Sequence, residues 1–387
     1  MNPWEQGLYW NNFPVKPKKH FGFLKDDIKR TNVATKTYPY LIYTGIKEIN
    51  FLWMYQNEEL LQGLKKTGLH IFLYEPVSYY LKDPTEFNHG YYSEIPNGSE
   101  PHAMCGELDS IQDFMIRTGI VCTVHTCDYK FNHYYQKKYP LLNIVTEDVF
   151  IKTHTRPPKD VYFVKDIKKK FVSIIGRYTP HRHLMMCYMA DKPGHYVWRY
   201  KTDFDEMMDK CVWNDDTLPY DYLRKQNDIV NNKTWKIDYN IEQKQVLDLN
   251  GGTEGVHSYN EDMVNAVNES FVMVVNETRF AQPTGNVSEK TFQAFNGLTP
   301  LILAAPPHSL EYLKDLGFRT FSNWWDESYD NEKNHNKRLL MLFKLIDEIN
   351  SKSIDELKDM YKDMMPTIEY NRMMMDRFNV REKVIYK

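Results

Sequence analysis

The sequence predicts an α/β protein of two domains, each built on a mainly parallel sheet that helices cover. Short apolar runs alternate with segments of helical period along most of the chain, the pattern of repeated strand and helix units. A length of 387 residues is enough for two domains of ordinary size. The segment Asp148 to Pro158, which ends in the stiff run Thr-Arg-Pro-Pro, lies between two such regions and suits an interdomain linker. We therefore expect one domain over 1–155, a second over 160–345, and carboxyl-terminal helices over 346–387.

The first domain is expected to alternate strands and helices from residue 40 onward. Leu60, Leu61 and Leu64 have helical spacing, whereas short apolar runs bounded by turn residues indicate strands. In chain order the expected elements are a strand at Tyr40–Thr44, a helix at Asn57–Thr67, a strand at His70–Tyr74, a helix at Leu108–Thr118, a strand at Ile120–His125, a helix at Phe131–Lys138 and a strand at Leu142–Val145.

The second domain is expected to begin with a buried strand at Phe171–Ile175. A Gly-Arg-Tyr-Thr-Pro turn follows, and His181, Arg182 and His183 then open an apolar helix. A strand, a glycine turn and a basic helix start form the kind of phosphate site that nucleotide-binding domains use. The glycine-rich fingerprint of dinucleotide enzymes is absent, so this is not the motif of a Rossmann dehydrogenase.

A second strand, Phe271–Val275, is short, rich in Val and ends in polar residues. It delivers Asn276, Glu277 and Thr278 to its carboxyl end, which is where open α/β sheets bind their ligands. We expect the carboxylate of Glu277 to take part in such a site.

A capped helix and a third strand complete this unit. Ser288 precedes an apolar-periodic run and is the expected N-cap, with Glu289 and Lys290 in the first turn of the helix. The strand Pro300–Ala304 follows. A helix start with free backbone donors, a lysine in its first turn and a nearby carboxylate suits a diphosphate and a ribose.

The last segment, Ile354 to Phe378, is rich in Met and amphipathic. It predicts either one helix or a pair of helices broken at Pro366. No internal repeat or low-complexity tract is evident.

The strand, Glu277, the loop, the Ser288-Glu289-Lys290 start, the helix and the Thr-Pro-Leu-Ile-Leu run from Thr299 resemble the donor-binding motif of the α1,3-fucosyltransferases and related GT-B glycosyltransferases. The resemblance covers the carboxyl half of the chain. It implies a GT-B fold, in which two Rossmann-like domains with mainly parallel sheets face a central cleft. It also implies that the carboxyl-terminal helices return to pack on the first domain.

The resemblance further implies a role for each matching residue. Lys290 would bind the diphosphate of a nucleoside-diphosphate sugar, Glu289 its ribose, and Glu277 would lie beside the donor sugar. The family places an arginine on the diphosphate after its first strand; Arg182 is the closest match and Arg177 the second choice. The alternative is that both arginines only pair with surface carboxylates.

Transfer of a sugar to a hydroxyl group also needs a general base, which we expect from the first domain. Acidic groups just past its strands are the candidates: Glu75 follows the run IFLY, and Asp128 follows the run VCTVHTC. No metal is required if Lys290 and Arg182 neutralise the departing diphosphate, and no Asp-x-Asp triplet is present. The nucleoside-diphosphate sugar is then a co-substrate and no further cofactor is expected.

The composition indicates a chain that stays in the cytoplasm. No apolar stretch is long enough to cross a membrane, and the first thirty residues lack the apolar core of a signal peptide. The five cysteines are an odd number without zinc spacing, so reduced thiols are expected. The formal net charge of -3 neither demands nor excludes a nucleic-acid partner. Basic clusters near aromatic residues, such as Lys65 with Lys66 and Lys168 to Lys170, suit either a phosphate backbone or a solvated face.

The acceptor is suggested by a second resemblance. The LGFRTF run from Leu316, the DESYD run from Asp326 and the abundance of Asn, Lys, Met and Tyr look like tailed-phage proteins. GT-B enzymes of such phages add glucose or arabinose to 5-hydroxymethylcytosine. The resemblance thus implies a phage DNA glycosyltransferase of arabinosyltransferase type, using UDP-arabinose, with double-stranded modified DNA as its partner in the host cytoplasm. Two alternatives stay open: a fucosyltransferase-like enzyme acting on a surface glycan or lipopolysaccharide, and a glycan- or DNA-binding protein without turnover.

Overall fold

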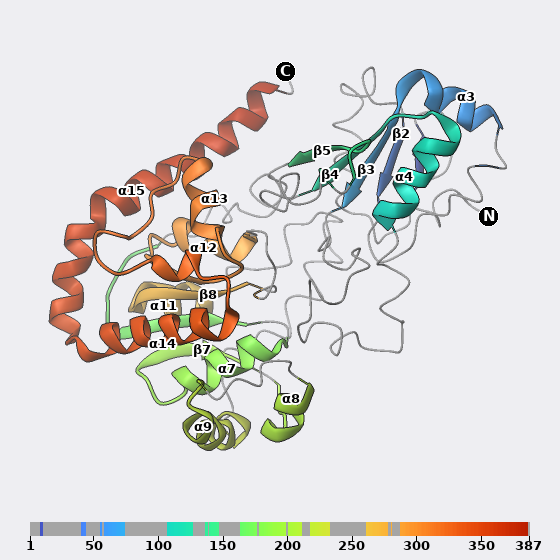
Figure 1. Ribbon diagram of the computed structural model, residues 1–387. Coiled ribbons are helices and arrows are strands. Elements are labelled where there is room, and N and C mark those ends of the chain that lie inside the picture. Colours follow the sequence, from blue (N-terminus) through green and yellow to red (C-terminus); the bar gives the residue numbers. More distant parts are fainter. Residues whose placement is uncertain are drawn as a thin grey trace.

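The computed structural model describes residues 8–10, 40–43, 55, 58–73, 107–126, 136–137, 139–146, 163–175, 178–198, 200–210, 217–232, 261–277, 280 and 287–385. These residues form two mainly parallel sheets flanked by helices, so the predicted α/β class with two parallel sheets is confirmed (Figure 1). The central cleft expected between the domains stays a prediction.

The first sheet has the strand order β1-β2-β3-β4-β5. Strands β2 to β5 are parallel and follow the chain order, whereas β1 is antiparallel to β2 at the edge. The sequence did not indicate β1, because a run of three residues shows no period. The bounds are β1 at Leu8–Trp10, β2 at Tyr40–Tyr43, β3 at Leu69–Leu73, β4 at Cys122–Thr126 and β5 at Asn143–Thr146, with helices α3 at Glu58–Thr67 and α4 at Glu107–Thr118.

Both helices of this domain end where the sequence predicts and lead directly into a strand. Leu64 on α3 and Phe114 on α4 are fully buried, as their helical spacing requires. Gly68 follows α3 with φ +78° and Gly119 follows α4 with φ +69°. Each glycine donates its N–H to the carbonyl four residues earlier at 2.8 Å, the bond that closes a helix with a left-handed residue. After each glycine the chain enters a strand, β3 after Gly68 and β4 after Gly119, and these two strands pair in parallel.

The second sheet has four parallel strands in the order β7-β6-β8-β9. Its strands are β6 at Lys169–Ile174, β7 at Gly194–Val197, β8 at Ser270–Asn276 and β9 at Leu301–Ala304. Its helices are α7 at Pro180–Met189, α8 at Phe204–Lys210, α9 at Tyr220–Asn232, α11 at Glu261–Glu269, α12 at Glu289–Asn296, α13 at Ser309–Asp315, the 3-10 turn η6 at Ser328–Asn331, α14 at His335–Ser351 and α15 at Ile354–Ile385.

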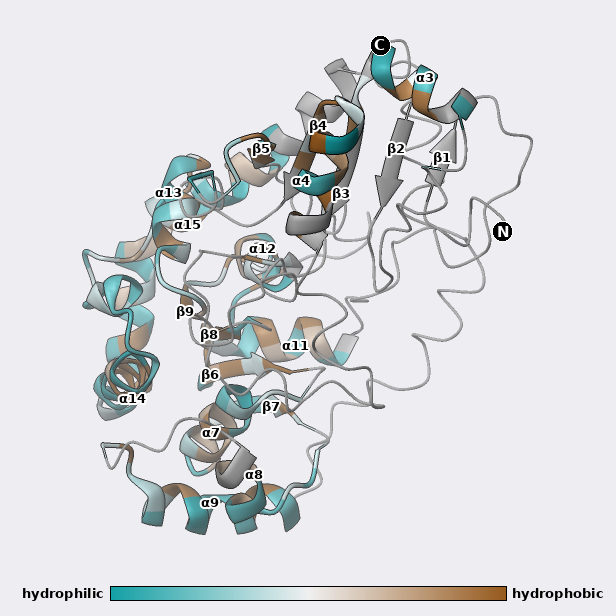
Figure 2. Cartoon of the chain, turned by 45° about the vertical axis from the view of Figure 1, so that its right-hand side comes forward, coloured by the Kyte–Doolittle hydropathy of each residue, from teal (hydrophilic) through white to brown (hydrophobic). Residues whose placement is uncertain are grey.

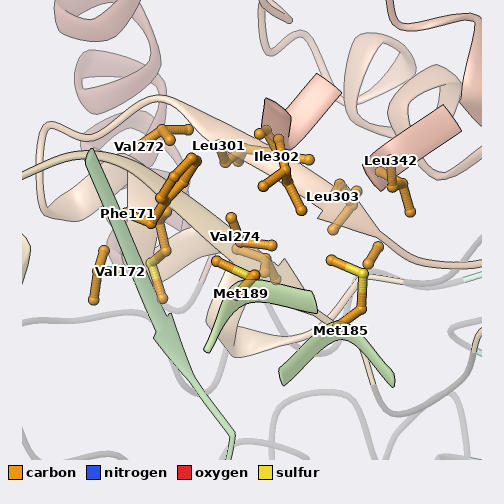
Figure 3. Close-up of a cluster of buried hydrophobic side chains, with 14 of the residues drawn as sticks. Phe171, Val172, Met185, Met189, Val272, Val274, Leu301, Ile302, Leu303 and Leu342 are labelled. Carbon is orange, nitrogen blue, oxygen red and sulfur yellow. The ribbon is translucent and has the colours of Figure 1, made fainter. Parts of the chain in front are cut away.

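The core of this domain forms around the apolar run of β8, in which every residue is buried. A parallel strand buried on both faces reads as a continuous apolar run, as Phe271 to Val275 does. Figure 3 shows side chains of β6, β8 and β9 in contact with side chains from α7 and α14. Full burial of one such side chain stabilises the fold by roughly 1.5–3 kcal/mol. The labelled core residues are Phe171, Val172, Met185, Met189, Val272, Val274, Leu301, Ile302, Leu303 and Leu342.

The carboxyl-terminal segment forms one continuous helix, α15, which runs through Pro366. Its described contacts are with the second domain. The hydroxyl of Tyr361 donates to the carbonyl of Leu298 at 2.8 Å, and the side chain of Asn371 bonds both backbone groups of Arg319 at 2.8 Å. Hydrophobic and hydrophilic residues are interspersed along α14 and α15 (Figure 2). Packing of this segment on the first domain stays a prediction, and the expected boundary at 345/346 falls inside α14.

The order of the second sheet has one consequence for ligand binding. From β6 the chain moves to β7 on one side, and later enters β8 on the other side of β6. The βα connections after β6 and β8 therefore leave the sheet in opposite directions. In open parallel sheets such a reversal opens a crevice at the carboxyl ends of the two strands, and ligands bind there. In the described part of the first sheet, β2 to β5 run in one direction without a reversal.

Candidate functional site

The candidate site lies at the carboxyl edge of β6, β8 and β9. The two segments that the sequence singled out, the start of α7 and the start of α12, both follow strands of this edge. Strand β8 pairs with β6 through Met273 and with β9 through Asn276. The structure thus brings the two predicted segments to the two sides of one strand end.

The start of α7 is bonded to the end of β8. Arg182 donates from Nε at 3.1 Å and from Nη2 at 2.7 Å to the carbonyl of Asn276. His181 Nε2 lies 2.8 Å from the carbonyl of Glu277, which can only accept, so this nitrogen carries the proton. The other ring nitrogen, Nδ1, lies 3.1 Å from Thr179 Oγ1 and accepts from it. These bonds hold the first turn of α7 against the last residues of β8.

The three basic side chains of this turn are buried: Arg182 and His183 are 0% exposed and His181 is 3% exposed. Burial lowers the pKa of His181 well below its usual range, and the charge of Arg182 lowers it further. His181 is therefore neutral, and the positive charge of the turn resides on Arg182. The Nε and Nη2 donors of Arg182 are directed to the backbone carbonyl of Asn276. The predicted contact of Arg182 with a diphosphate stays a prediction.

Glu277 holds the start of α12. Its side chain is 1% exposed, and its Oε1 accepts from the backbone N–H of Ser288 at 2.7 Å and from Thr291 Oγ1 at 2.9 Å. A carboxylate at a helix start is stabilised by the free N–H groups and the helix dipole. Glu277 therefore fixes the position of α12 relative to β8, whether or not it also contacts a donor sugar.

Ser288 is the N-cap of α12, as the sequence predicts. Its hydroxyl accepts from the N–H of Lys290 at 3.4 Å, and the Lys290 ammonium lies 3.5 Å from the same hydroxyl. Lys290 is half-buried, and its contact with Ser288 places the ammonium charge at the helix start. Glu289 is the first residue of the helix. The predicted roles of Ser288, Glu289 and Lys290 in donor binding stay predictions.

A residue that the sequence did not single out, Arg338 of α14, contacts Phe280, which lies between β8 and α12 in the chain. Its guanidinium carbon lies 4.2 Å from the ring centroid of Phe280, and Nη2 donates to the carbonyl of Phe280. Nη1 donates to the carbonyl of Glu332 at 2.5 Å. His181 stacks on the same ring of Phe280, with centroids 5.0 Å apart. Burial lowers the pKa of Arg338 to about 9, which leaves it charged at neutral pH.

The third connection of this edge, between β9 and α13, contains His308. This residue has φ +67°, and its backbone N–H donates to the carbonyl of Asp330 at 2.7 Å. The Asp330 carboxylate accepts from the backbone N–H groups of Leu310 at 2.9 Å and Glu311 at 3.2 Å. Burial raises the pKa of Asp330, and these backbone donors oppose the rise. The imidazole Nδ1 of His308 lies 2.9 Å from Glu311 Oε2.

Several sequence-derived candidates lie outside the described residues. These are the two proposed bases, Asp128 and Glu75, together with Arg177 and Thr278. Their roles stay predictions. Within the described part of the chain, no group of three or more His, Cys, Asp or Glu side chains is arranged to hold a metal ion.

Two of the cysteines are described, and both are free, buried thiols. Burial raises the pKa of Cys122 to about 12 and that of Cys187 further, so neither is a reactive thiolate at neutral pH. The expectation of reduced core thiols is confirmed for these two. Among the helices in the described ranges, none combines the length and apolar character needed to span a bilayer.

No protein-family model and no curated protein matches the chain. Among solved structures, the chain is similar to the crystal structure of the DNA-modifying enzyme β-glucosyltransferase, determined in the presence and absence of its substrate uridine diphosphoglucose. The similarity covers 89% of this chain and 80% of that chain, at 8% sequence identity and a TM-score of 0.36.

Proposed function

We propose that this chain is a glycosyltransferase that moves a sugar from a nucleoside-diphosphate sugar to a hydroxyl group. The donor binds at the carboxyl edge of the second sheet, between β6 and β8. The observation that carries the proposal is that the chain reverses direction at this point and that both donor-motif segments meet there. Strand and turn patterns, helix capping and the resemblance to the donor motif predicted the two segments; their meeting at a reversal point is a property of the fold.

The charges at this edge favour an anionic group on the donor. Arg182 and Arg338 are buried, and the bonds given above join them to backbone carbonyls. Glu277 is directed toward the start of α12 and Asp330 toward α13. The ammonium of Lys290 stands at the helix start, where it would meet a diphosphate as a charge, because the N–H groups of Ser288 and Lys290 already donate to Glu277 and to the Ser288 hydroxyl.

The reaction follows from this placement. The acceptor oxygen attacks the anomeric carbon, the bond from that carbon to the diphosphate oxygen breaks, and a base takes the proton of the acceptor hydroxyl. Lys290 stabilises the negative charge that builds up on the departing nucleoside diphosphate. This assignment requires no bound metal. The buried arginines act on the same charge through space and hold the loops that shape the site.

We propose 5-hydroxymethylcytosine in double-stranded DNA as the acceptor and UDP-arabinose as the donor. The support is the resemblance to tailed-phage proteins. The residues that carry it serve packing: Gly317 closes α13 with φ +92°, Phe318 and Phe321 are buried, and Arg319 stacks on Tyr370 of α15 at 3.9 Å. A hydroxymethyl group inside a duplex would have to leave the base stack to reach the anomeric carbon.

The basic clusters named in the sequence divide into two kinds. Lys65 and Lys66 are exposed at the end of α3 and remain suited to a phosphate backbone. Lys168 pairs with Glu269 at 2.8 Å, and Lys170 donates to the carbonyl of Asn350, so these two serve the fold. DNA contacts in the proposed complex are therefore expected from the first domain.

The test uses the full chain with a panel of sugar nucleotides and with hydroxymethylated or plain DNA. Mass spectrometry of the digested nucleosides reports transfer, and release of free nucleoside diphosphate reports donor turnover. We expect a pentose on hydroxymethylcytosine and none on plain DNA. Donor turnover without DNA modification would overturn the DNA acceptor and point to a glycan. Absence of donor binding and turnover with every sugar nucleotide would overturn the enzyme assignment.

A further inference from the structure

His308 is held in a backbone conformation that residues other than glycine rarely adopt. Among the described residues, two non-glycine residues have positive φ: Leu298 with φ 49° and His308 with φ 67°. Leu298 precedes β9, at the amino edge of the sheet, whereas His308 follows β9 at the carboxyl edge, where the candidate site lies. Strained residues are retained when the surrounding structure enforces them, and they gather at functional sites.

The surroundings of His308 enforce its conformation. Pro306 and Pro307 precede it and restrict the chain that leads out of β9. Its N–H is bonded to the carbonyl of Asp330, and the carboxylate of Asp330 binds the next turn of backbone through Leu310 and Glu311. The direction in which the imidazole projects is thus set by a rigid turn.

The imidazole presents one edge to a carboxylate and the rest to the surface. Its Nδ1 is buried and lies 2.9 Å from Glu311 Oε2 in a geometry that makes no hydrogen bond, while the side chain as a whole is 20% exposed. The exposed part therefore belongs to the other atoms of the residue. The carboxylate occupies the space beside Nδ1, so a proton from a substrate would be taken up at the second ring nitrogen, Nε2.

His308 belongs to the same edge as the donor segments. Ala304 at the end of β9 pairs with Asn276, and its carbonyl accepts from the N–H of Glu277 at 2.9 Å. Arg338, which is bonded to the carbonyl of Phe280, also interacts electrostatically with Asp330. The connections after β8 and β9 are thus joined through this arginine.

The charges around His308 suit a neutral hydroxyl group better than an anion. Asp330 occupies the backbone donors at the start of α13, and Glu311 is in contact with the imidazole. We propose that His308 is the general base of the transfer reaction, and this inference rests on the proposed function. As the acceptor oxygen bonds to the anomeric carbon and the diphosphate leaves, the hydroxyl proton passes to the imidazole, and Glu311 stabilises the imidazolium.

The test is His308→Asn in the full chain, because Asn tolerates a positive φ and cannot act as a base. Leu298→Asn is the matched control, since it makes the same change at the other strained position, away from this edge. Donor affinity is measured by calorimetry, transfer by mass spectrometry and folding by thermal melting. We expect His308→Asn to lose about a hundredfold or more of the transfer rate with donor affinity retained. Glu311→Gln should lose less, and Leu298→Asn should keep its transfer rate.

Three results would contradict the proposal. Transfer by His308→Asn within about tenfold of the unchanged protein would exclude a general base, given the usual size of that effect. A parallel loss of donor affinity would make His308 a donor-binding residue instead. A much lower melting temperature than that of Leu298→Asn would mean that the residue serves the fold, and Glu311→Gln then decides alone: an unchanged rate overturns the proposal. The same assay is applied to Asp128→Asn and Glu75→Gln, because these two residues are the rival candidates for the base.

If the unchanged protein binds no sugar nucleotide, the proposed function itself fails.

Discussion

Replacement of Glu277 by Gln tests the idea that a buried carboxylate fixes the donor edge. The carboxylate accepts two hydrogen bonds, from the Ser288 N–H and the Thr291 hydroxyl, and is 1% exposed. Gln keeps the shape and one acceptor oxygen but removes the charge. A hydrogen bond to a charged group contributes roughly 1.5–3 kcal/mol and one between neutral groups roughly 0.5–1.5, so two such bonds should lose about 2 kcal/mol in all.

For a domain of 150–250 residues, a loss of about 2 kcal/mol lowers the melting temperature by roughly 4–8 °C. Thermal and urea unfolding of the Glu277→Gln variant measure it. The matched control is Glu356→Gln, which removes an exposed carboxylate bonded to the N–H of Ser353 at the start of α15. The control should change the melting temperature by no more than about 2 °C, because exposed charges are screened. Equal shifts in the two variants would refute the claim that the Glu277 charge anchors α12.

Three further changes test the charges at this edge. Lys290→Ala should weaken donor binding by about 2 kcal/mol, roughly thirtyfold, in calorimetry and leave the melting temperature unchanged. Arg182→Ala should instead lower the unfolding free energy by about 3–5 kcal/mol, because Arg182 is fully buried and bonded to Asn276, and denaturant unfolding measures this. Stability should also fall in acid. Burial lowers the folded-state pKa of His181 and His183 below the unfolded value, so below about pH 6.5 the unfolded chain binds protons that the fold excludes. The unfolding free energy should then drop by up to about 1.4 kcal/mol per pH unit for each histidine, and His181→Gln should flatten that slope. A slope that is the same in both proteins would contradict the neutral state of His181.

The parts of the fold that local patterns determine were predictable from the sequence. The strand Phe271–Val275 lies within β8, and Ser288 is the N-cap of α12, because apolar runs and capping residues act over a few positions. Strand β7 was not predicted, since its four residues, Gly-His-Tyr-Val, have no clear period. The pairing that creates the reversal between β6 and β8 joins segments about a hundred residues apart, and local patterns do not contain it.

The candidate site was predictable in its place but not in its bonding. The residues His181, Arg182 and His183 predicted a basic helix start at a phosphate site, yet all ten residues of α7 are buried. Arg338 contacts Phe280 from 58 positions away and belongs to no motif, so only the tertiary structure reveals it. His308 had a signal that could have been used: a Pro-Pro-His run directly after a strand, at the edge where ligands bind.

The bonding at this edge also fixes several of its charged groups. Arg182, Glu277 and Asp330 have protein partners on the ends of β8, α12 and α13, so their charges are fixed before any ligand arrives. Fixed charges and dipoles stabilise a transition state without the cost of reorienting during the reaction. Lys290 and His308 are the partly exposed members of the same edge, one cationic and one able to take a proton. The proposed transfer needs a stabilised leaving group and a deprotonated acceptor. Loss of Lys290 should therefore slow transfer by weakening donor binding, whereas loss of His308 should slow turnover with donor affinity retained.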